Sequence, residues 1–362
     1  MKLATPLSTK LGLALPIVQA PMAGGPSSQT LVAACSAAGV LGSFGFAYTQ
    51  PEEMKKQCAW VRAQTDRPFG INLFTWTPPP QIDPASQRDA LAAVAGYYQE
   101  LGLPAPAPVN APYAPGLDAQ LDAVAEIGPK VFTVHLSDLP EKRIAALKAR
   151  NILLGGSANC IAEAQRLEQL GFDFVIAQGG EAGGHRGSYL RDPYASLTGT
   201  LALTRLLVRA VKLPVVAAGG IMDGAGIAAV FALGAQLAQL GTAFIPCPES
   251  GASQAHKDAV LAAREDDTSI TEKFSGKPAR GLTNRFMKEM TAAPHLAFPA
   301  QNSVTGRLRQ ASAQAGKPDF VALWAGQAVP LARALPAAEL IAKLAAETAE
   351  SIQNLKGILH DA

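Results

Sequence analysis

Eight short apolar segments recur along the chain, and most of them end in glycine or a small polar residue. They occupy residues 15–22, 39–46, 67–74, 129–136, 151–158, 172–180, 213–221 and 235–244. Segments with helical periodicity lie between most of them, as at 28–39, 141–151, 161–171 and 223–235. Continuous apolar strands that alternate with amphipathic helices indicate parallel strands buried on both faces.

Eight such strand–helix units predict an α/β fold, and specifically a closed (β/α)8 or TIM barrel. An open doubly wound sheet is the alternative, but no segment has the pattern of an edge strand. We expect the barrel domain to span residues 1–244, with a long insertion at 75–128 after the third strand. Residues 245–362 have a mostly helical pattern, and we expect this extension to cover the mouth of the barrel.

The composition excludes several classes of protein. The 362 residues are 48% hydrophobic and 17% charged with a net charge of +2, so a broad nucleic-acid-binding face is not expected. No segment has the roughly 18 uninterrupted apolar residues of a membrane span, and the N-terminus has no signal-peptide core. The four cysteines are scattered and fit neither a disulfide framework nor a zinc site. We therefore expect a cytoplasmic protein without a metal site.

The predicted strand ends are rich in glycine and poor in carboxylates. Active sites of parallel barrels form where the carboxyl ends of the strands converge. The shortage of acids there argues against a carboxylate-bound metal and against a glycosidase with two carboxylates. Glycine-rich strand ends suit a large flat ligand that the backbone approaches closely.

The last two strand ends predict a phosphate site at Gly219, Gly220, Gly241 and Thr242. In barrels, phosphate is often held by the loops after strands seven and eight and by a helix N-terminus. Asp223 is the expected N-cap of the helix that follows the glycine pair. The alternative is that these glycines only allow close packing of helices on strands.

His185 is the candidate catalytic residue. It follows the sixth strand in the glycine-rich segment 178–189, so its imidazole can lie over the barrel mouth and exchange a proton near neutral pH. The alternative is an exposed loop histidine. His135, on a strand, is interpreted as a satisfied core or rim residue, and the remaining histidines, His256, His295 and His360, show no clustering.

Three further features remain open on the sequence alone. Cys160 has no evident base beside it and is interpreted as a buried residue at a helix start. Asn72 ends an apolar strand and needs a partner, either a ligand or a backbone group. A basic loop could close on an anion or be a solvated surface loop, and it contains Lys277, Arg280 and Arg285.

With these residues in view, the chain resembles the nitronate monooxygenases of class I, formerly called 2-nitropropane dioxygenases. The matching segments are QAPMAGG (19–25), GINLF (70–74), AQGGEAGGHRG (177–187), PVVAAGGI (214–221), AQLGTAF (238–244), FSGKPARGLTNRF (274–286), FPAQN (298–302) and WAGQ (324–327). The resemblance spans nearly the whole chain. The EAGGH element alone is shared with flavin-dependent enoyl reductases and NADH:quinone reductases.

The resemblance implies a barrel that binds flavin mononucleotide (FMN), with His185 in the position of the family's catalytic histidine. The cofactor-binding residues expected from it and from the strand ends are Ala20, Pro21, Met22, Asn72, Gln178, Gly183, Gly219, Gly220, Gln239, Leu240, Gly241 and Thr242. The family also holds its substrate with aromatic residues and a positive charge near the barrel mouth. The candidates for this role are Tyr113, Phe298 and Arg307.

The reaction implied by the resemblance is the oxidation of alkyl nitronates by O2, giving a carbonyl compound plus nitrite or nitrate without NAD(P)H. The nitronate would be of the propionate 3-nitronate type, and the partners would be this small molecule and O2; a homodimer stays open. One alternative is an NADH-dependent FMN reductase that acts on a quinone or an enoyl thioester. Another is a barrel that binds a phosphorylated metabolite without redox chemistry.

Overall fold

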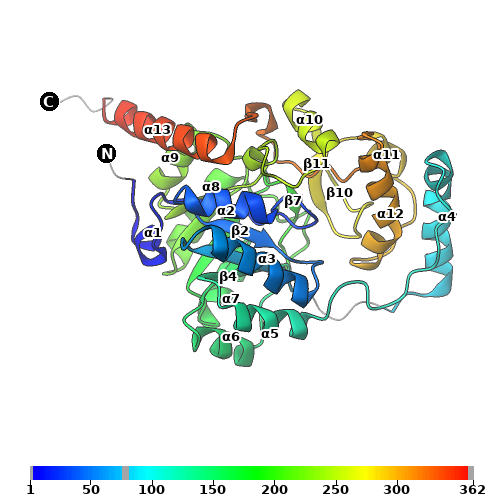
Figure 1. The fold of residues 1–362 in the computed structure, drawn as a ribbon, viewed down its shortest axis with the longest axis horizontal. Coiled ribbons are helices and arrows are strands. Elements are labelled where there is room, and N and C mark those ends of the chain that lie inside the picture. Colours follow the sequence, from blue (N-terminus) through cyan, green and yellow to red (C-terminus); the bar gives the residue numbers. More distant parts are fainter. Residues whose placement is uncertain (1–2, 76–80, 358–362) are drawn as a thin grey trace.

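Eight parallel strands form a barrel in the computed structural model, which describes residues 3–75 and 81–357 (Figure 1). The strands are β1 (Ile17–Gln19), β2 (Gly42–Gly45), β3 (Phe69–Phe74), β4 (Val131–His135), β5 (Leu153–Ala158), β6 (Phe174–Gln178), β8 (Val215–Ala218) and β9 (Leu237–Leu240). The hydrogen-bonded order is β1-β9-β8-β6-β5-β4-β3-β2. A parallel bridge between Val18 and Leu41 brings β1 to the start of β2. The predicted TIM barrel is therefore confirmed.

A ring of helices covers the outside of the barrel. These helices are α2 (Gln29–Ala37), α3 (Pro51–Gln64), α5 (Leu117–Ile127), α6 (Glu141–Lys148), α7 (Ile161–Gln169), α8 (Thr200–Ala210) and α9 (Gly224–Ala232). Side chains that cap the first turn fix where some of them begin. Asp223 accepts a hydrogen bond from the Gly226 amide, as its predicted role as an N-cap requires, and Ser28 caps α2 in the same way.

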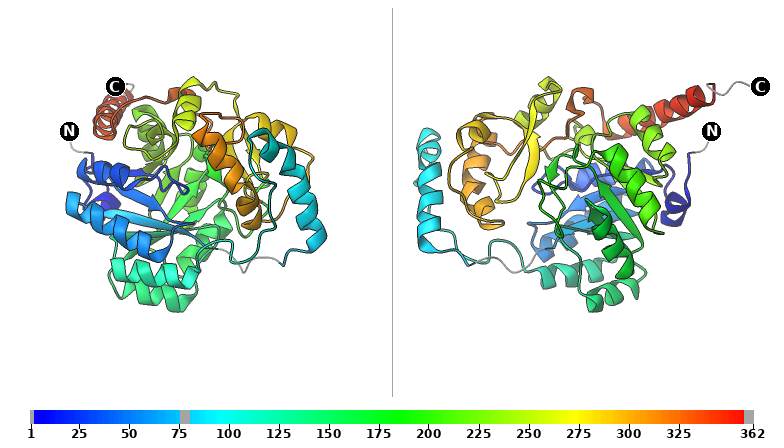
Figure 2. Two further views of the ribbon diagram at one scale, coloured as in Figure 1. Left: turned by 45° about the vertical axis from the view of Figure 1, so that its right-hand side comes forward. Right: turned by 180° about the vertical axis from the view of Figure 1, so that it is seen from behind.

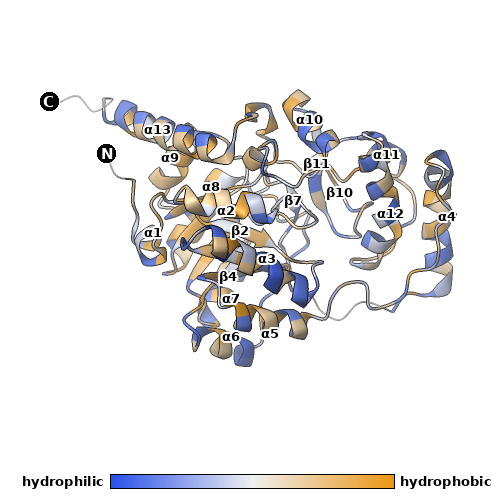
Figure 3. Cartoon of the chain, in the orientation of Figure 1, coloured by the Kyte–Doolittle hydropathy of each residue, from blue (hydrophilic) through white to orange (hydrophobic). Residues whose placement is uncertain are grey.

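The barrel interior is filled by apolar side chains from alternate strand positions, such as Val18, Val131 and Ile176. Helix α1 (Pro6–Leu11) closes the end that holds the strand N-termini, because Leu7 and Leu11 pack into the same cluster. Apolar residues lie along the central strands in Figure 3, whereas polar and apolar residues alternate along the outer helices.

The described residues 81–128 of the expected insertion divide between two parts of the molecule. Helix α5 is a regular barrel helix that packs against α3. Helix α4 (Pro84–Glu100) instead lies at the far edge of the structure and packs against α12 (Ala300–Gln314) (Figure 2). The excursion from the barrel therefore ends before α5.

The C-terminal part contains two strands among its helices. It comprises α10 (Gln254–Ala262), β10 (Thr268–Thr271), β11 (Ala279–Leu282), α11 (Arg285–Glu289), α12 and α13 (Ala337–Lys356), with short 3-10 turns at η1 (Thr242–Phe244) and η2 (Val329–Leu331). We call α4, α10, α11, α12, β10 and β11 the second lobe. Helix α13 does not belong to it, because it packs on the outside of the barrel against α9 and α2.

The second lobe is joined to the barrel by backbone pairing. Strand β11 pairs with β10 on one side and with the two-residue strand β7 (Gly184–His185) on the other, and both pairings are antiparallel. Because β7 follows barrel strand β6, a glycine-rich barrel loop forms the edge of the lobe's sheet. None of the helices in the described ranges is long and apolar enough to cross a lipid bilayer.

Candidate active site

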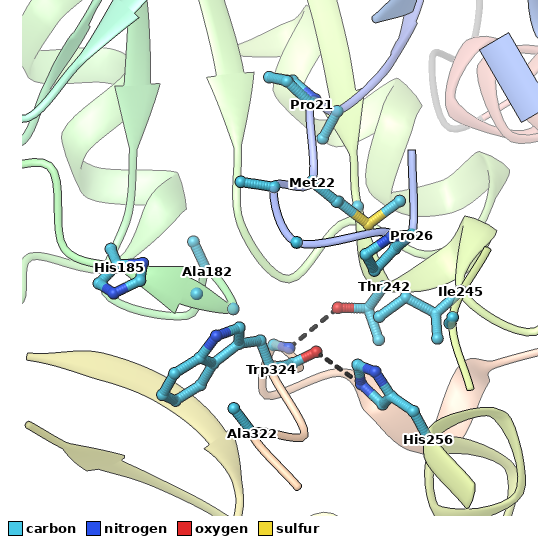
Figure 4. Close-up of a pocket in the computed structure, with 18 of the residues that line it drawn as sticks. Pro21, Met22, Pro26, Ala182, His185, Thr242, Ile245, His256, Ala322 and Trp324 are labelled. Atoms are coloured by element: carbon cyan, nitrogen blue, oxygen red, sulfur yellow. Dashed lines mark hydrogen bonds between the residues drawn. The ribbon is translucent and has the colours of Figure 1, made fainter. Parts of the chain in front are cut away.

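A cavity of about 620 Å³ lies at the carboxyl ends of the barrel strands, between the barrel and the second lobe. This volume falls within the range typical of cofactor and substrate sites. In Figure 4 its wall is seen with Met22 and Pro26 on one side, Trp324 and Ala322 on the other, and His185 and His256 at opposite ends. Parallel strands converge here, so distant segments of the chain contribute to one wall.

All but one of the catalytic and cofactor-binding residues expected from the sequence line this cavity. Its wall includes His185, Ala20, Pro21, Met22, Asn72, Gln178, Gly183, Gly219, Gly220, Gln239, Gly241 and Thr242. Leu240 differs, because its side chain is buried in the core with Ile17 and Ala217. Strand alternation explains this: neighbours along a strand point to opposite faces, so Leu240 faces away from its neighbour Gln239.

Small residues shape the wall after β8 and β9. Gly219 has a φ of 117° and Gly220 a φ of 68°, which only glycine adopts without strain. Thr242 begins the 3-10 turn η1, where the first amides of a helical turn have no acceptor within the turn itself. The Thr242 hydroxyl accepts a hydrogen bond of 2.9 Å from the amide of Gly326, which ties this turn to the C-terminal segment.

His185 is held on several sides at the edge of the lobe's sheet. Its Nε2 lies 2.8 Å from the Ser275 hydroxyl. Three aromatic rings surround the imidazole, with centroids 5.4 Å (Phe74), 5.8 Å (Phe298) and 5.6 Å (Trp324) from its own. The side chain is 8% exposed, so the imidazole faces the cavity rather than bulk water.

Burial keeps His185 neutral. Desolvation lowers its pKa to about 3, and the nearby His135, Lys277 and Arg309 act in the same direction. The structure therefore opposes a protonated His185 at neutral pH before a ligand binds. This disfavours the role in which a charged imidazolium of the free protein attracts an anion.

Two side chains fix the main chain of His185. Its carbonyl accepts a hydrogen bond of 2.9 Å from Gln178 Nε2 and another of 3.1 Å from His135 Nε2. The Oε1 atom of Gln178 accepts from Asn159 and from the amide of Gly187. Gln178 thus uses its side-chain amide to position the histidine loop, although it also lines the cavity.

The hydrogen bonds of His135 agree with its expected character as a satisfied core or rim residue. Its Nε2 donates to the His185 carbonyl, so its Nδ1 accepts from the Ser157 hydroxyl at 2.7 Å. The structure nevertheless places it in the cavity wall, as it does His256, whose Nε2 donates to the Trp324 carbonyl. Desolvation lowers the pKa of both rings to about 4. The sequence did not indicate that these two histidines share the cavity with His185.

The positive charge in the wall comes from Arg309 rather than from the candidate Arg307. Arg307 is exposed, whereas Arg309 lines the cavity, and burial lowers its pKa. The Arg309 guanidinium donates to Thr305 and Asn302, but its Nη1 has no hydrogen-bond partner among residues 3–75 and 81–357.

Tyr48 adds a second unpartnered polar group to this part of the wall. Its hydroxyl is buried and has no hydrogen-bond partner in the described part of the chain, and burial raises its pKa to about 12 despite the opposing charge of Arg309. Of the other aromatic candidates, Phe298 lies beside His185, and Tyr113 packs in the second lobe away from the cavity. Neither the tyrosine nor the arginine stood out in the sequence, because no local motif marks them.

The remaining candidates fall outside the cavity wall. Burial raises the pKa of the Cys160 thiol at the start of α7, so no activated thiolate forms there. Lys277 and Arg280 are largely buried and donate to the carbonyls of Ser188 and Gly180. Arg285 is exposed and pairs with Glu100 and Glu289. His360 lies outside the described residues.

The wall also lacks two features of other enzyme classes. No aspartate or glutamate is among the described residues that line the cavity. Within the described ranges, no three His, Cys, Asp or Glu side chains come together as a set that could hold a metal ion. A glycine-rich barrel mouth with a neutral buried histidine and one cationic side chain is suited to a bound organic cofactor and an anionic substrate.

Comparison with known proteins gives the family. The chain belongs to the nitronate monooxygenase family, whose model matches residues 5–347. It is 42% identical to the nitronate monooxygenase of Paraburkholderia phytofirmans over 96% of this chain and 95% of that protein. It is 41% identical to the nitronate monooxygenase of Pseudomonas aeruginosa over 93% of this chain and 97% of that protein. The chain is therefore an oxidoreductase of this family.

Solved structures agree with this assignment. The chain superposes on the nitroalkane oxidase of Streptomyces ansochromogenes with a TM-score of 0.88 and 38% identity, covering 96% of this chain and 99% of that one. The FabK structure from Thermotoga maritima matches with a TM-score of 0.75 and 27% identity over 99% of this chain and 100% of that one.

Proposed function

We propose that this protein uses FMN to oxidise alkyl nitronates with O2, giving a carbonyl compound plus nitrite or nitrate without NAD(P)H. The observation that carries the proposal is the charge of the cavity wall: it holds a partly buried arginine, a phenol with a buried hydroxyl and a neutral imidazole, but no described carboxylate. Such a wall favours an electron-rich anion and does not compete with it for the arginine.

The residues present fit FMN. Asn72 donates its side-chain amide to Thr133, which leaves its Oδ1 free to accept, and the Gln239 side chain has no partner among the described residues. These two groups would meet the polar edge of the flavin ring. A Cβ on Gly219 would lie 2.8 Å from the Thr200 hydroxyl and 2.9 Å from the Ala182 amide nitrogen, so only glycine lets this part of the wall approach those groups so closely.

The phosphate of FMN would be held at Gly220, Gly241 and Thr242, through backbone amides at the start of η1. Ala20, Pro21 and Met22 would contact the ring through the loop after β1. When bound, the flavin supplies the electron transfer from the nitronate to O2. Every other contribution comes from the protein, which binds, orients and desolvates the substrate.

Arg309 and Tyr48 are the groups that would bind the anionic substrate. The free Nη1 of Arg309 and the unpartnered hydroxyl of Tyr48 can both donate to a carboxylate or nitronate oxygen. Phe74, Phe298 and Trp324 exclude water around His185, which strengthens these contacts. A substrate such as propionate 3-nitronate, with charge at both ends, uses this arrangement fully.

Spectroscopy and oxygen uptake test the proposal. The purified protein should show a flavin spectrum and should consume O2 when propionate 3-nitronate is added, with nitrite or nitrate released. Anaerobic NADH should leave the spectrum unchanged; rapid bleaching would instead favour an NADH-dependent reductase. A colourless protein that takes up no FMN on incubation would favour a metabolite-binding barrel without redox chemistry.

Arg309→Met tests the substrate site. Loss of a hydrogen bond to a charged group costs about 1.5 kcal/mol or more, so KM for propionate 3-nitronate should rise about tenfold relative to KM for ethyl nitronate, which lacks the carboxylate. Arg307→Met is the matched control, because Arg307 is exposed two positions away on the same helix. Equal effects of both variants on the two substrates would remove Arg309 from this role.

His185→Asn tests the histidine. The variant should retain the flavin spectrum and lose most turnover of a neutral nitroalkane, which needs a base to remove its α-proton. Turnover of the preformed nitronate should fall less, because that anion carries no proton to be removed. Unchanged turnover of the neutral nitroalkane would exclude His185 as the base.

A further inference from the structure

Ser275 is the polar side chain in contact with the imidazole of His185. It lies in the turn between β10 and β11 and is 2% exposed. Its hydroxyl oxygen lies 2.8 Å from His185 Nε2, 3.2 Å from the Lys277 carbonyl and 3.4 Å from the Lys277 amide nitrogen.

The turn that carries Ser275 is closely fitted. A Cβ on Gly276, which has a φ of 85°, would lie 2.4 Å from the Leu296 carbonyl oxygen. The amide of Phe298 donates to the Gly276 carbonyl, and Lys277 Nζ donates to the Ser188 carbonyl. The hydroxyl of Ser275 is thus held beside the imidazole from the lobe side, while β7 holds the histidine backbone.

The three contacts of this hydroxyl determine the acceptor to which it donates its proton. The Lys277 carbonyl can only accept, and the Lys277 amide can only donate. A hydroxyl has a single proton, and the arrangement that satisfies all three contacts sends it to the Lys277 carbonyl. The oxygen then accepts from the Lys277 amide and from a proton on His185 Nε2. In that arrangement Nδ1 carries the lone pair, and it has no partner among the described residues.

We propose that Ser275 is a positioning residue that holds His185 in the Nε2–H tautomer, so that Nδ1 is the atom that accepts the α-proton of a neutral nitroalkane. The inference rests on the proposed function. In this step the α C–H bond breaks, its electron pair forms the C=N bond of the nitronate, and the proton moves to Nδ1. The resulting imidazolium still shares its Nε2 proton with Ser275, and no oxidant is needed.

The rest of the environment is compatible with this role. The His185 carbonyl is fixed by Gln178 and His135, and the rings of the three neighbouring aromatic residues restrict rotation of the imidazole. The charged and titratable groups that act on it are His135 from β4, Lys277 from the same turn as Ser275, and Arg309 from α12. None of these is within hydrogen-bond distance of Nδ1, so the tautomer depends on the serine.

Nitrogen NMR of the holoprotein tests the proposal directly. With ¹⁵N-labelled histidine, and with the signals of residue 185 assigned by their loss in His185→Asn, Nδ1 should show the shift of an unprotonated nitrogen and Nε2 that of a protonated one. A proton on Nδ1 in the unmodified protein would overturn the proposal. This measurement needs no folded serine variant, and it does not depend on whether nitronates are substrates.

Kinetics of Ser275→Ala give the second readout. We expect mixed tautomers at His185 and a fall in kcat/KM for nitroethane of about tenfold or more, in the range of a misplaced general base. The value for ethyl nitronate should change less than about twofold, since that substrate needs no base. Ser275→Thr keeps the hydroxyl and should restore the single tautomer and most of the nitroethane rate.

Thr271→Val is the matched control, because Thr271 lies in the same hairpin and its hydroxyl accepts from the Lys273 amide rather than from the imidazole. It should leave the His185 signals and both rates unchanged. A single wild-type tautomer and an unchanged nitroethane rate in Ser275→Ala would refute the proposal. If the unmodified protein shows no O2 uptake with any nitronate, the proposed function fails, while the NMR result still decides the tautomer.

Discussion

The low pKa of His256 makes the stability of the fold sensitive to acid. Comparing the free energy of unfolding of His256→Gln with that of the unmodified protein gives the size of this effect. Desolvation lowers the pKa of His256 from 6.5 to about 4, and its side chain is 5% exposed. Because the folded state binds a proton less readily than the unfolded chain, stability is fully present above pH 6.5 and is lost as the pH falls toward 4.

The size of this effect follows from the linkage relation. At about pH 5, which is about 1.5 units below the ordinary pKa, protonation stabilises the unfolded chain by about 1.5 × 1.36, or about 2 kcal/mol. The folded protein gains almost nothing at this pH, because its His256 remains neutral. His256→Gln removes the titrating group, and its amide nitrogen can replace Nε2 as the donor to the Trp324 carbonyl.

Urea unfolding at about pH 7.5 and about pH 5 checks the prediction. The free energy of unfolding should fall by about 2 kcal/mol less in His256→Gln than in the unmodified protein. Carboxylates titrate equally in both proteins and cancel in this comparison. His295→Gln is the control, because that ring is less buried and lies 3.4 Å from Glu272, which opposes the lowering of its pKa. An identical pH dependence in His256→Gln and the unmodified protein would refute the reasoning.

Three further substitutions probe how the loops of the site are held. Glu163→Ala leaves the buried amide of Asn159 and the less buried amides of Tyr189 and Leu190 without their acceptor. It should lower the free energy of unfolding by about 3 kcal/mol, whereas Glu163→Gln should lower it less; calorimetry measures both. Gly183→Ala would place a Cβ 2.6 Å from the Ala325 backbone and should destabilise the protein by about 1–3 kcal/mol. Gly96 lies in helix α4 with open space around it, so Gly96→Ala should stabilise the protein by about 0.5–1 kcal/mol. Thr242→Val leaves the Gly326 amide without an acceptor and should cost about 1–3 kcal/mol; a thermal midpoint equal to that of the unmodified protein would contradict this.

The barrel could be predicted from the sequence because each of its strands is buried on both faces. Continuous apolar runs such as Phe174–Gln178 therefore stand out against the periodic helices between them. The second lobe gave no such signal. Helix α4 packs Val94 and Tyr98 against Phe286 and Val304, residues about two hundred positions later, and no local pattern identifies such partners.

In the site, too, some residues could be predicted from the sequence and others could not. The glycines after β8 and β9 were found because barrel topology places them at one mouth. Arg309 was missed in favour of Arg307, because the choice depends on which face of α12 meets the cavity, and that face is set by packing of Val304 and Leu308. Strand alternation alone would have shown that the side chains of Gln239 and Leu240 point to opposite faces, so that only one of them can line the cavity. The contacts of His185 with Ser275 and Trp324 required the tertiary structure.

The pairing of β7 with β11 has a consequence for how the protein matures. During synthesis the chain leaves the ribosome from its N-terminus, so the eight barrel strands emerge before β11, Ser275 and Trp324. Until those later residues arrive, the histidine loop has neither its pairing strand nor its aromatic enclosure. A chain that ends before β11 therefore lacks both the strand that pairs with the His185 loop and the Trp324 ring that packs against its imidazole.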